Sequence, residues 1–281
     1  MAGHSVRSLR DFGITPLRTR VLGRACTARA RGGIILICVA RTRKVHGTAG
    51  LMVLLTAVAG WVDSVAYVRS GSVFVANQTG NAVFLAVQVA ERWVPGVHHA
   101  GVAAESDTYG PFSSLVGFCV GVAISVLPLR RSRRVGDAEA PWILLAIEAL
   151  LLASVIVLAS APRELRLGVA AAAMGVQSTY AAGVAMRGVS TTTLTGTLVT
   201  LISAFAEEPG HRVRQGIMLL TMVWAAYTIG AWGGAAAGLS WSIGTVHGFA
   251  AAAVGLAAAA VWWDRRQNRR QDQQQNHRRP A

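Results

Sequence analysis

Charged residues are scarce in this chain, and their scarcity is the first clue to its class. Only 14% of its 281 residues are charged, whereas a soluble domain has about 25%. Apolar runs of about 20 residues, the length that a helix needs to cross a bilayer, recur through the middle of the chain. These features exclude an ordinary soluble domain and predict an all-α integral membrane protein.

Cysteine is also rare, and Cys26, Cys38 and Cys119 have no paired spacing. Their positions exclude a cysteine-based metal clip, a redox motif and a disulfide framework. The sequence likewise has no nucleophile–base arrangement, no phosphate-binding loop and no zinc-ligand spacing. We therefore expect no catalytic residues, no metal site and no cofactor, and we do not expect an enzyme.

The charge that is present is strongly basic and lies mainly at the two ends. The net charge is +14, and 10 of the 27 Lys and Arg precede Thr48 while 6 follow Trp263. Such flanks are typical of the cytoplasmic tails of membrane proteins, so we expect no nucleic-acid partner and two cytoplasmic termini. Residues 1–48 are expected to be a disordered basic tail or the product of a misassigned start codon. Residues 264–281 are expected to be a basic, Gln-rich tail.

Eight hydrophobic segments occupy the region between these tails. They are residues 49–68, 72–90, 112–129, 142–161, 165–186, 189–206, 216–239 and 241–263. The first four resemble the last four in the same order. This pattern predicts two homologous repeats, residues 49–161 and 162–263.

Three features recur at corresponding places in the two halves. They are a polar phrase, a pair of glycines four residues apart, and a tryptophan followed six residues later by an ionisable residue. In the first and second half these are VANQTGNAV (75–83) and STTTLTGTLV (190–199), Gly117–Gly121 and Gly230–Gly234, and Trp142–Glu148 and Trp241–His247.

The charge distribution also indicates which segments cross the membrane. If all eight crossed it, the four arginines within 130–134 would lie outside, against the positive-inside rule. If 72–90 and 189–206 instead enter and return on the same side, these arginines become cytoplasmic. We therefore expect about six transmembrane helices and two short re-entrant or broken segments. With three crossings in each half the repeats would be inverted, which is a common way to build a transport site.

Polar side chains recur at helical spacing in the second and sixth segments. The two stripes are Asn77–Asn81–Gln88 and Thr193–Thr197–Thr200. Amide and hydroxyl groups at such positions could replace the hydration shell of a small polar solute or ion. The alternative is that they hydrogen-bond between helices as packing contacts.

Three ionisable residues, Asp63, Glu148 and His247, lie within apolar segments. A charge at the bilayer centre costs on the order of 3 kcal/mol on insertion scales, so such residues usually face a cavity or a partner. Asp63 could instead pair with the nearby Arg69 at the membrane interface. Glu148 could make a structural hydrogen bond, and His247 could lie at the interface.

Gly60, Asp63 and the phrases VFVANQTGN (73–81) and MGVQSTYAAGVAMRGVSTTTLTGTL (174–198) carry a family resemblance. They are similar to the YoaK-like family of bacterial membrane proteins, which is catalogued as a domain of unknown function. The resemblance covers about 48–264, and the long basic leader departs from the family pattern. It implies a protein with several spans in the bacterial inner membrane, and it implies no substrate or reaction.

Together these features predict a transporter or channel-like permease for a small polar solute or ion, surrounded by the lipid bilayer of the inner membrane. The candidate substrate-binding residues are Asp63, Asn77, Thr79, Asn81, Glu148, Gln177, Thr193, Thr195, Thr197 and His247. The alternative is a scaffold or regulatory subunit, in which the Gly and Thr faces serve only for packing. The oligomeric state is left open.

Overall fold

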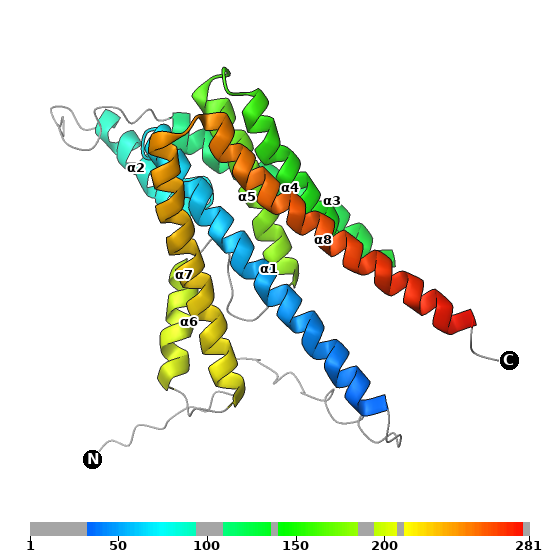
Figure 1. The fold of residues 1–281 in the computed structure, drawn as a ribbon. Helices are drawn as coiled ribbons and strands as arrows, with labels where there is room; N and C mark the ends of the chain where they lie inside the picture. The colour runs from blue at the N-terminus through cyan, green and yellow to red at the C-terminus, as the bar shows by residue number, and fades with distance from the viewer. Residues whose placement is uncertain (1–32, 94–108, 136–139, 185–193, 207–210, 278–281) are drawn as a thin grey trace, which may run out of the picture. The chain divides into compact units, whose positions relative to one another are not determined.

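The computed structural model describes residues 33–93, 109–135, 140–184, 194–206 and 211–277. Within these ranges the chain forms helices and no strands, which confirms the all-α class (Figure 1). The helices are α1 (Gly33–Arg69), α2 (Gln78–Trp93), α3 (Tyr109–Val135), α4 (Ala140–Val157), α5 (Arg163–Val184), α6 (Leu194–Ala206), α7 (His211–Ser240) and α8 (Ile243–His277). The chain divides into two compact units, Met1–Val45 and His46–Ala281. The second unit holds α2 to α8 and α1 from His46 onward.

Among the described residues, four helices are long and apolar enough to cross a membrane. They are Gly47–Arg69 in α1, Tyr109–Pro128 in α3, Gly216–Ser240 in α7 and Ile243–Gln271 in α8. A shorter apolar helix, Trp142–Val157, lies in α4. Large apolar side chains on these helices are exposed, as surfaces that meet lipid must be. The chain is therefore a membrane protein whose helices contact the bilayer.

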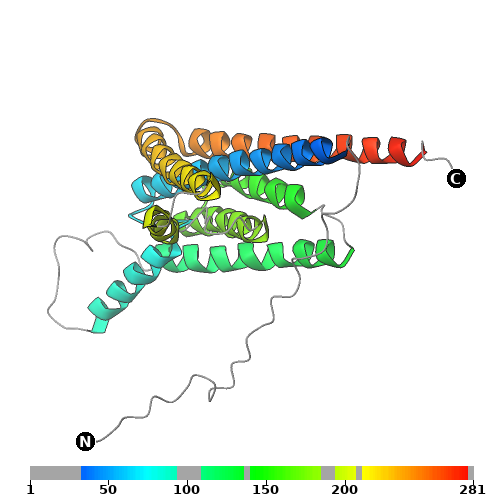
Figure 2. The same ribbon diagram turned by 90° about the horizontal axis from the view of Figure 1, so that it is seen from below.

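Helix α5 lies inside the bundle. Its residues 170–177 are all buried, and most of them are alanine or glycine. Helices α3 and α4 pack against it (Figure 2). On a further side, the Gln177 amide donates a hydrogen bond to the Leu55 carbonyl of α1 at 3.0 Å. Because α5 is packed by other helices on several sides, small side chains let those helices come close, and α5 has no separate lipid-facing stripe.

Two pairs of helices touch through glycine. A Cβ atom added at Gly117 or Gly121 of α3 would come within about 2 Å of the carbonyl oxygens of Gly168 and Ala172 in α5, at 2.1 and 2.0 Å. The same holds where α7 crosses α1. There, added Cβ atoms at Gly230 and Gly234 would lie 2.0 and 2.4 Å from the carbonyl oxygens of Ala57 and Trp61. Glycine is needed at both crossings because the backbones themselves are in contact.

These contacts fix the directions of four helices. Residue numbers rise together along α1 and α7 and also along α3 and α5, so each pair is parallel. Helices α1 and α5 are antiparallel, because Leu55 meets Gln177 whereas Arg69 and Arg166 line one pocket. Helices α1 and α7 therefore run one way, and α3 and α5 run the other.

Helices α4 and α8 lie side by side in Figures 1 and 2 and are antiparallel. Added Cβ atoms at Gly244 and Gly248 would contact Ile156, whereas one at Gly255 would contact Ala149. Val155, near the end of α4, lines the same pocket as Arg69, near the end of α1. Helix α4 therefore runs with α1 and α7, and α8 runs with α3 and α5.

The segment between α1 and α2 folds back along α1. Gly71 and Ser72 both have left-handed backbone angles, with φ of 73° and 61°. Val75 and Ala76 are then buried against the bundle, and α2 starts only at Gln78. The predicted helical stripe is therefore wrong at its first position, because Asn77 lies in the turn before the helix. We call residues 70–77 the re-entrant turn.

Candidate functional site

Asp63 of α1 holds the re-entrant turn in place. Its Oδ1 accepts hydrogen bonds from the backbone N–H groups of Val75 at 2.8 Å and Ala76 at 2.6 Å. Its Oδ2 accepts a hydrogen bond from the Tyr227 hydroxyl of α7 at 2.7 Å. Non-helical backbone at membrane depth must have its polar groups bonded within the protein. The buried Asp63 carboxylate supplies that bonding and explains why the turn is not helical.

Asn81, in the first turns of α2, closes the other side of the same turn. Its Oδ1 accepts from the Phe74 N–H at 3.0 Å, and its Nδ2 donates to the Phe74 carbonyl at 2.6 Å. Nδ2 also lies 3.1 Å from Gln78 Oε1 and 3.0 Å from the Ser114 hydroxyl of α3. Ser114 in turn donates to the Phe74 carbonyl at 2.6 Å. The polar phrase is thus a hydrogen-bonded clamp between α1, α2, α3 and α7.

The structure excludes one alternative that the sequence left open. Asp63 does not pair with Arg69, whose guanidinium instead donates to the carbonyls of Gly238 and Trp241 at the end of α7. Asn77 makes a long 3.5 Å contact to the Gly80 N–H, as a helix N-cap does. Thr79 is exposed.

Glu148 and Gln177 form a second polar group, deep in the bundle. Both side chains are 0% exposed. Both carboxyl oxygens of Glu148 and the Oε1 of Gln177 have no hydrogen-bond partner among the described residues. Buried polar atoms are nearly always paired, so each exception calls for an explanation.

The helix register places these two side chains opposite each other. Val155 of α4 and Ala170 of α5 line the same pocket. Glu148 lies seven residues before Val155, and Gln177 lies seven residues after Ala170. Because α4 and α5 run in opposite directions and seven residues make about two turns, both steps lead to the same level and the same faces.

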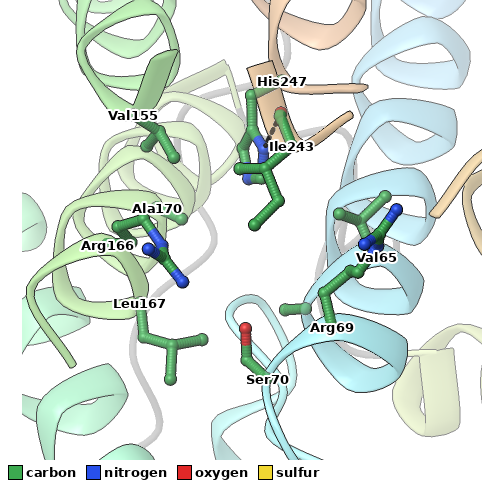
Figure 3. A pocket seen from close by; sticks show the side chains of 10 residues that line it. Val65, Arg69, Ser70, Val155, Arg166, Leu167, Ala170, Ile243 and His247 are labelled. Atoms are coloured by element: carbon green, nitrogen blue, oxygen red, sulfur yellow. Dashed lines mark hydrogen bonds between the residues drawn. The ribbon is translucent and has the colours of Figure 1, made fainter. Parts of the chain in front are cut away.

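The pocket itself lies at the end of the bundle marked by Arg69. Figure 3 shows Arg69 of α1, Arg166 of α5 and His247 of α8 around one cavity of about 20 Å³, enough for one water molecule. Arg166 donates to the carbonyls of Ala159 and Ala161 at 2.8 Å, just beyond α4. His247 is 8% exposed, and its Nδ1 lies 3.0 Å from the Ile243 carbonyl.

The structure therefore divides the predicted site residues into three groups. Asp63, Asn77 and Asn81 belong to the clamp, Glu148 and Gln177 to the buried pair, and His247 to the pocket. Thr193 lies outside the described residues. Thr195 and Thr197 lie in α6, where their side chains are not described. No group of three or more His, Cys, Asp or Glu that could hold a metal ion occurs among the described residues.

Tyr227 and Ser114, which complete the clamp, were not predicted from the sequence. Tyr227 lies in a long apolar segment, and only the fold brings it to Asp63 across 164 residues. Ser114 is one of several small residues on α3. Arg69 could have been suspected, because it lies in the last turn of a helix, where carbonyls need donors.

Long apolar helices and buried polar groups with protein partners define a multi-pass membrane protein. Residues 51–262 match a family described as protein of unknown function (DUF1275), and the chain belongs to this family.

A curated relative is the UPF0700 transmembrane protein YoaK of Bacillus subtilis (strain 168). It is 31% identical over 156 residues, which are 54% of this chain and 64% of the relative. The match thus covers slightly less than two thirds of the relative's length. The resemblance stated from the sequence is confirmed. No solved structure matches the chain.

Proposed function

We propose that the chain is a secondary transporter or channel-like permease for a small polar solute or ion. Its two halves, residues 49–161 and 162–263, are inverted repeats that cross the bacterial inner membrane six times, with both termini in the cytoplasm.

The helix directions support the inverted repeats. Each of α1, α3 and α4 runs opposite to its counterpart, α5, α7 or α8. The close glycine contacts also correspond between the halves. Helix α3 of the first half crosses α5 of the second, and α7 of the second half crosses α1 of the first. Opposed halves of this kind often enclose a transport site near the midplane.

The bounds of the re-entrant turn support six crossings. Helix α1 ends with Arg69 beside the end of α7, and Ser113, in the first turns of α3, is bonded to the Glu164 carbonyl at the start of α5. Both contacts lie at the same end of the bundle, because α1 and α5 are antiparallel. Helix α3 therefore begins at the end of the bundle where α1 ends, which supports a segment that enters and returns on the same side.

The unpaired Glu148 carboxyl carries the proposal. An ionisable group without a partner, buried in the middle of a membrane bundle, is costly and marks a functional path in most membrane proteins. The clamp does not serve this purpose, because the described partners of Asp63 and Asn81 are protein groups.

The test is reconstitution of the full chain in liposomes and a screen of small polar solutes for uptake and for accompanying pH or voltage changes. Transport in wild type and in Glu164→Gln, together with loss in Glu148→Gln, is the expected result. Glu164 is a matched control because its carboxylate lies at a helix end beside Arg163. A screen in which no solute moves in wild type would contradict the proposal.

The topology has a separate test. Single cysteines replace Ser70, Ser106 and Ser132 in a background without Cys26, Cys38 and Cys119, and an impermeant thiol reagent is added to intact cells. Six crossings require labelling at positions 70 and 106 from the periplasm and none at position 132.

A scaffold role is the second candidate, favoured by the complete pairing of the clamp. It predicts that variants of Asn81 lower stability and change no flux.

A further inference from the structure

Among the described residues, three buried oxygen atoms of α4 and α5 lack a hydrogen-bond donor. They are Oε1 and Oε2 of Glu148 and Oε1 of Gln177, and the register of α4 and α5 brings the two side chains to one level. The Nε2 of Gln177 is already used, since it donates to the Leu55 carbonyl at 3.0 Å. The amide orientation is fixed by that bond, so Oε1 of Gln177 is available as an acceptor.

An ionised Glu148 would leave this arrangement with acceptors only. A carboxylate has no hydrogen to donate, and an amide oxygen has none either. Adding one proton to Glu148 converts one carboxyl oxygen into a donor. A single O–H···O bond then gives both the protonated oxygen of Glu148 and the Oε1 of Gln177 a hydrogen-bond partner.

The surroundings favour a proton over a larger cation. Leu144, Leu145 and Leu152 of α4 and Met174 of α5 are at most 1% exposed and pack in one core cluster around this level. A sodium ion would need several further oxygen ligands, and the leucine and methionine side chains of this cluster have none. A proton needs no such shell.

Glu148 is 0% exposed, and its carboxyl oxygens have no hydrogen-bond partner in the part of the chain that the structure describes. Tyr180 of α5, one turn beyond Gln177, interacts electrostatically with Glu148 and with Arg265 of α8. Arg69, Arg166 and His247 lie further along the bundle, around the pocket (Figure 3). Arg166 is about three turns from Gln177, and Arg69 is about four turns from Leu55, which Gln177 contacts.

The pair thus has a polar neighbour on each side along the bundle. The pocket lies two turns towards one end, and Tyr180 with Arg265 lies towards the other. A group between two such approaches can take a proton from one side and release it to the other when the halves move.

We propose that Glu148 is a proton-binding site, with Gln177 as the acceptor that holds the protonated form. Proton uptake forms an O–H bond on one carboxyl oxygen, and release breaks that bond and leaves the carboxylate. This inference rests on the proposed function and deepens it by naming the proton as the ion that moves with the solute.

The first test does not depend on transport. Infrared difference spectra of the full chain in lipid nanodiscs are recorded across a pH series in H₂O and D₂O. Wild type should show a carboxylic C=O band that shifts in D₂O and is lost as pH rises. Glu148→Gln should lose the band, Glu164→Gln should keep it, and Gln177→Leu should move it to higher frequency because the hydrogen bond is gone. A band unchanged in Glu148→Gln, or one that does not shift in D₂O, would overturn the proposal.

Glu148→Asp guards against misfolding, since it keeps a carboxyl group on a shorter side chain. It should retain a titrating band at a changed frequency. Helix content by circular dichroism verifies that each variant is folded.

A second arm separates this inference from the proposed function. If the band behaves as expected and no solute moves, the proton site stands and the transport proposal falls. If a solute moves and the band is unaffected by Glu148→Gln, transport stands and the proton site falls.

Discussion

The start of α2 and the start of α6 occupy corresponding places in the proposed repeats, and they differ in the packing around their glycines. A Cβ atom at Gly80 would lie 3.0 Å from the Phe74 ring, which packs between Tyr67 and Phe84. A Cβ atom at Gly196 would meet nothing within 4 Å. An added methyl group would therefore meet a ring at Gly80 and have free space at Gly196.

The difference begins in the helix before each phrase. The crossings align Ala57 and Trp61 of α1 with Gly168 and Ala172 of α5, so Asp63 corresponds to Met174. The carboxylate that anchors the re-entrant turn has no counterpart. In the same alignment, Gln177 corresponds to Ala66. At each of these two positions, one half carries a polar side chain where the other has an apolar one.

The largest effect is expected at the anchor itself. Asp63→Leu leaves two buried N–H groups and the Tyr227 hydroxyl without an acceptor, and it should lower the free energy of unfolding by about 4 kcal/mol. Met174→Leu, at the corresponding place, should cost less than about 1.5 kcal/mol. Unfolding with SDS in mixed micelles, followed by circular dichroism, measures both. Equal losses would show that the anchor is not special to the first half.

The next effect tests what the halves share. Gly121→Ala and Gly230→Ala each drive a Cβ into a backbone carbonyl, and each should cost about 3 kcal/mol. Gly216→Ala, where nothing lies within 4 Å, is the matched control and should cost nothing. The same unfolding measurement applies. A strong effect at only one crossing would break the proposed equivalence.

A smaller effect should separate the two asparagines of the clamp. Asn81→Ala removes four contacts from a buried side chain and should cost about 2 kcal/mol. Asn77→Ala removes one weak cap and should cost less than about 1 kcal/mol. Thr200→Ala in the second half should have almost no effect, because this exposed hydroxyl bonds to the Gly196 carbonyl of its own helix. Thermal stability in detergent ranks the three variants.

The smallest effects should differ in sign. Gly80→Ala should destabilise by about 1 kcal/mol, because the new methyl group meets a ring that is held by its neighbours. Gly196→Ala should stabilise by up to about 1 kcal/mol, because alanine favours the helix and the site is open. Melting temperatures of the two variants decide the matter. The same sign for both would remove the contrast between the halves.

The sequence predicted the helices well because membrane crossing sets both their length and their composition. The predicted segments 165–186 and 216–239 became Arg163–Val184 and His211–Ser240. The paired glycines at 117 and 121 also proved to be contacts. Long-range partners were not predictable, since nothing local in the sequence links Asp63 to Tyr227. For the same reason the helical spacing of the polar stripe misplaces Asn77. Hydrogen bonds from Val75 and Ala76 to Asp63 keep this part of the chain non-helical, so that α2 starts only after Asn77.

The burial of α5 has a consequence for how the protein is made. The middle of α5 consists mainly of small residues rather than large apolar ones, and its first turn carries Arg163, Glu164 and Arg166. A translocon inserts a segment into the bilayer according to its hydrophobicity. Helix α5 is therefore expected to insert poorly on its own. Helices α3 and α4 precede α5 in the chain and pack against it. We therefore expect α5 to insert together with them. Membrane insertion of the second half is then expected to depend on the prior insertion of the first half.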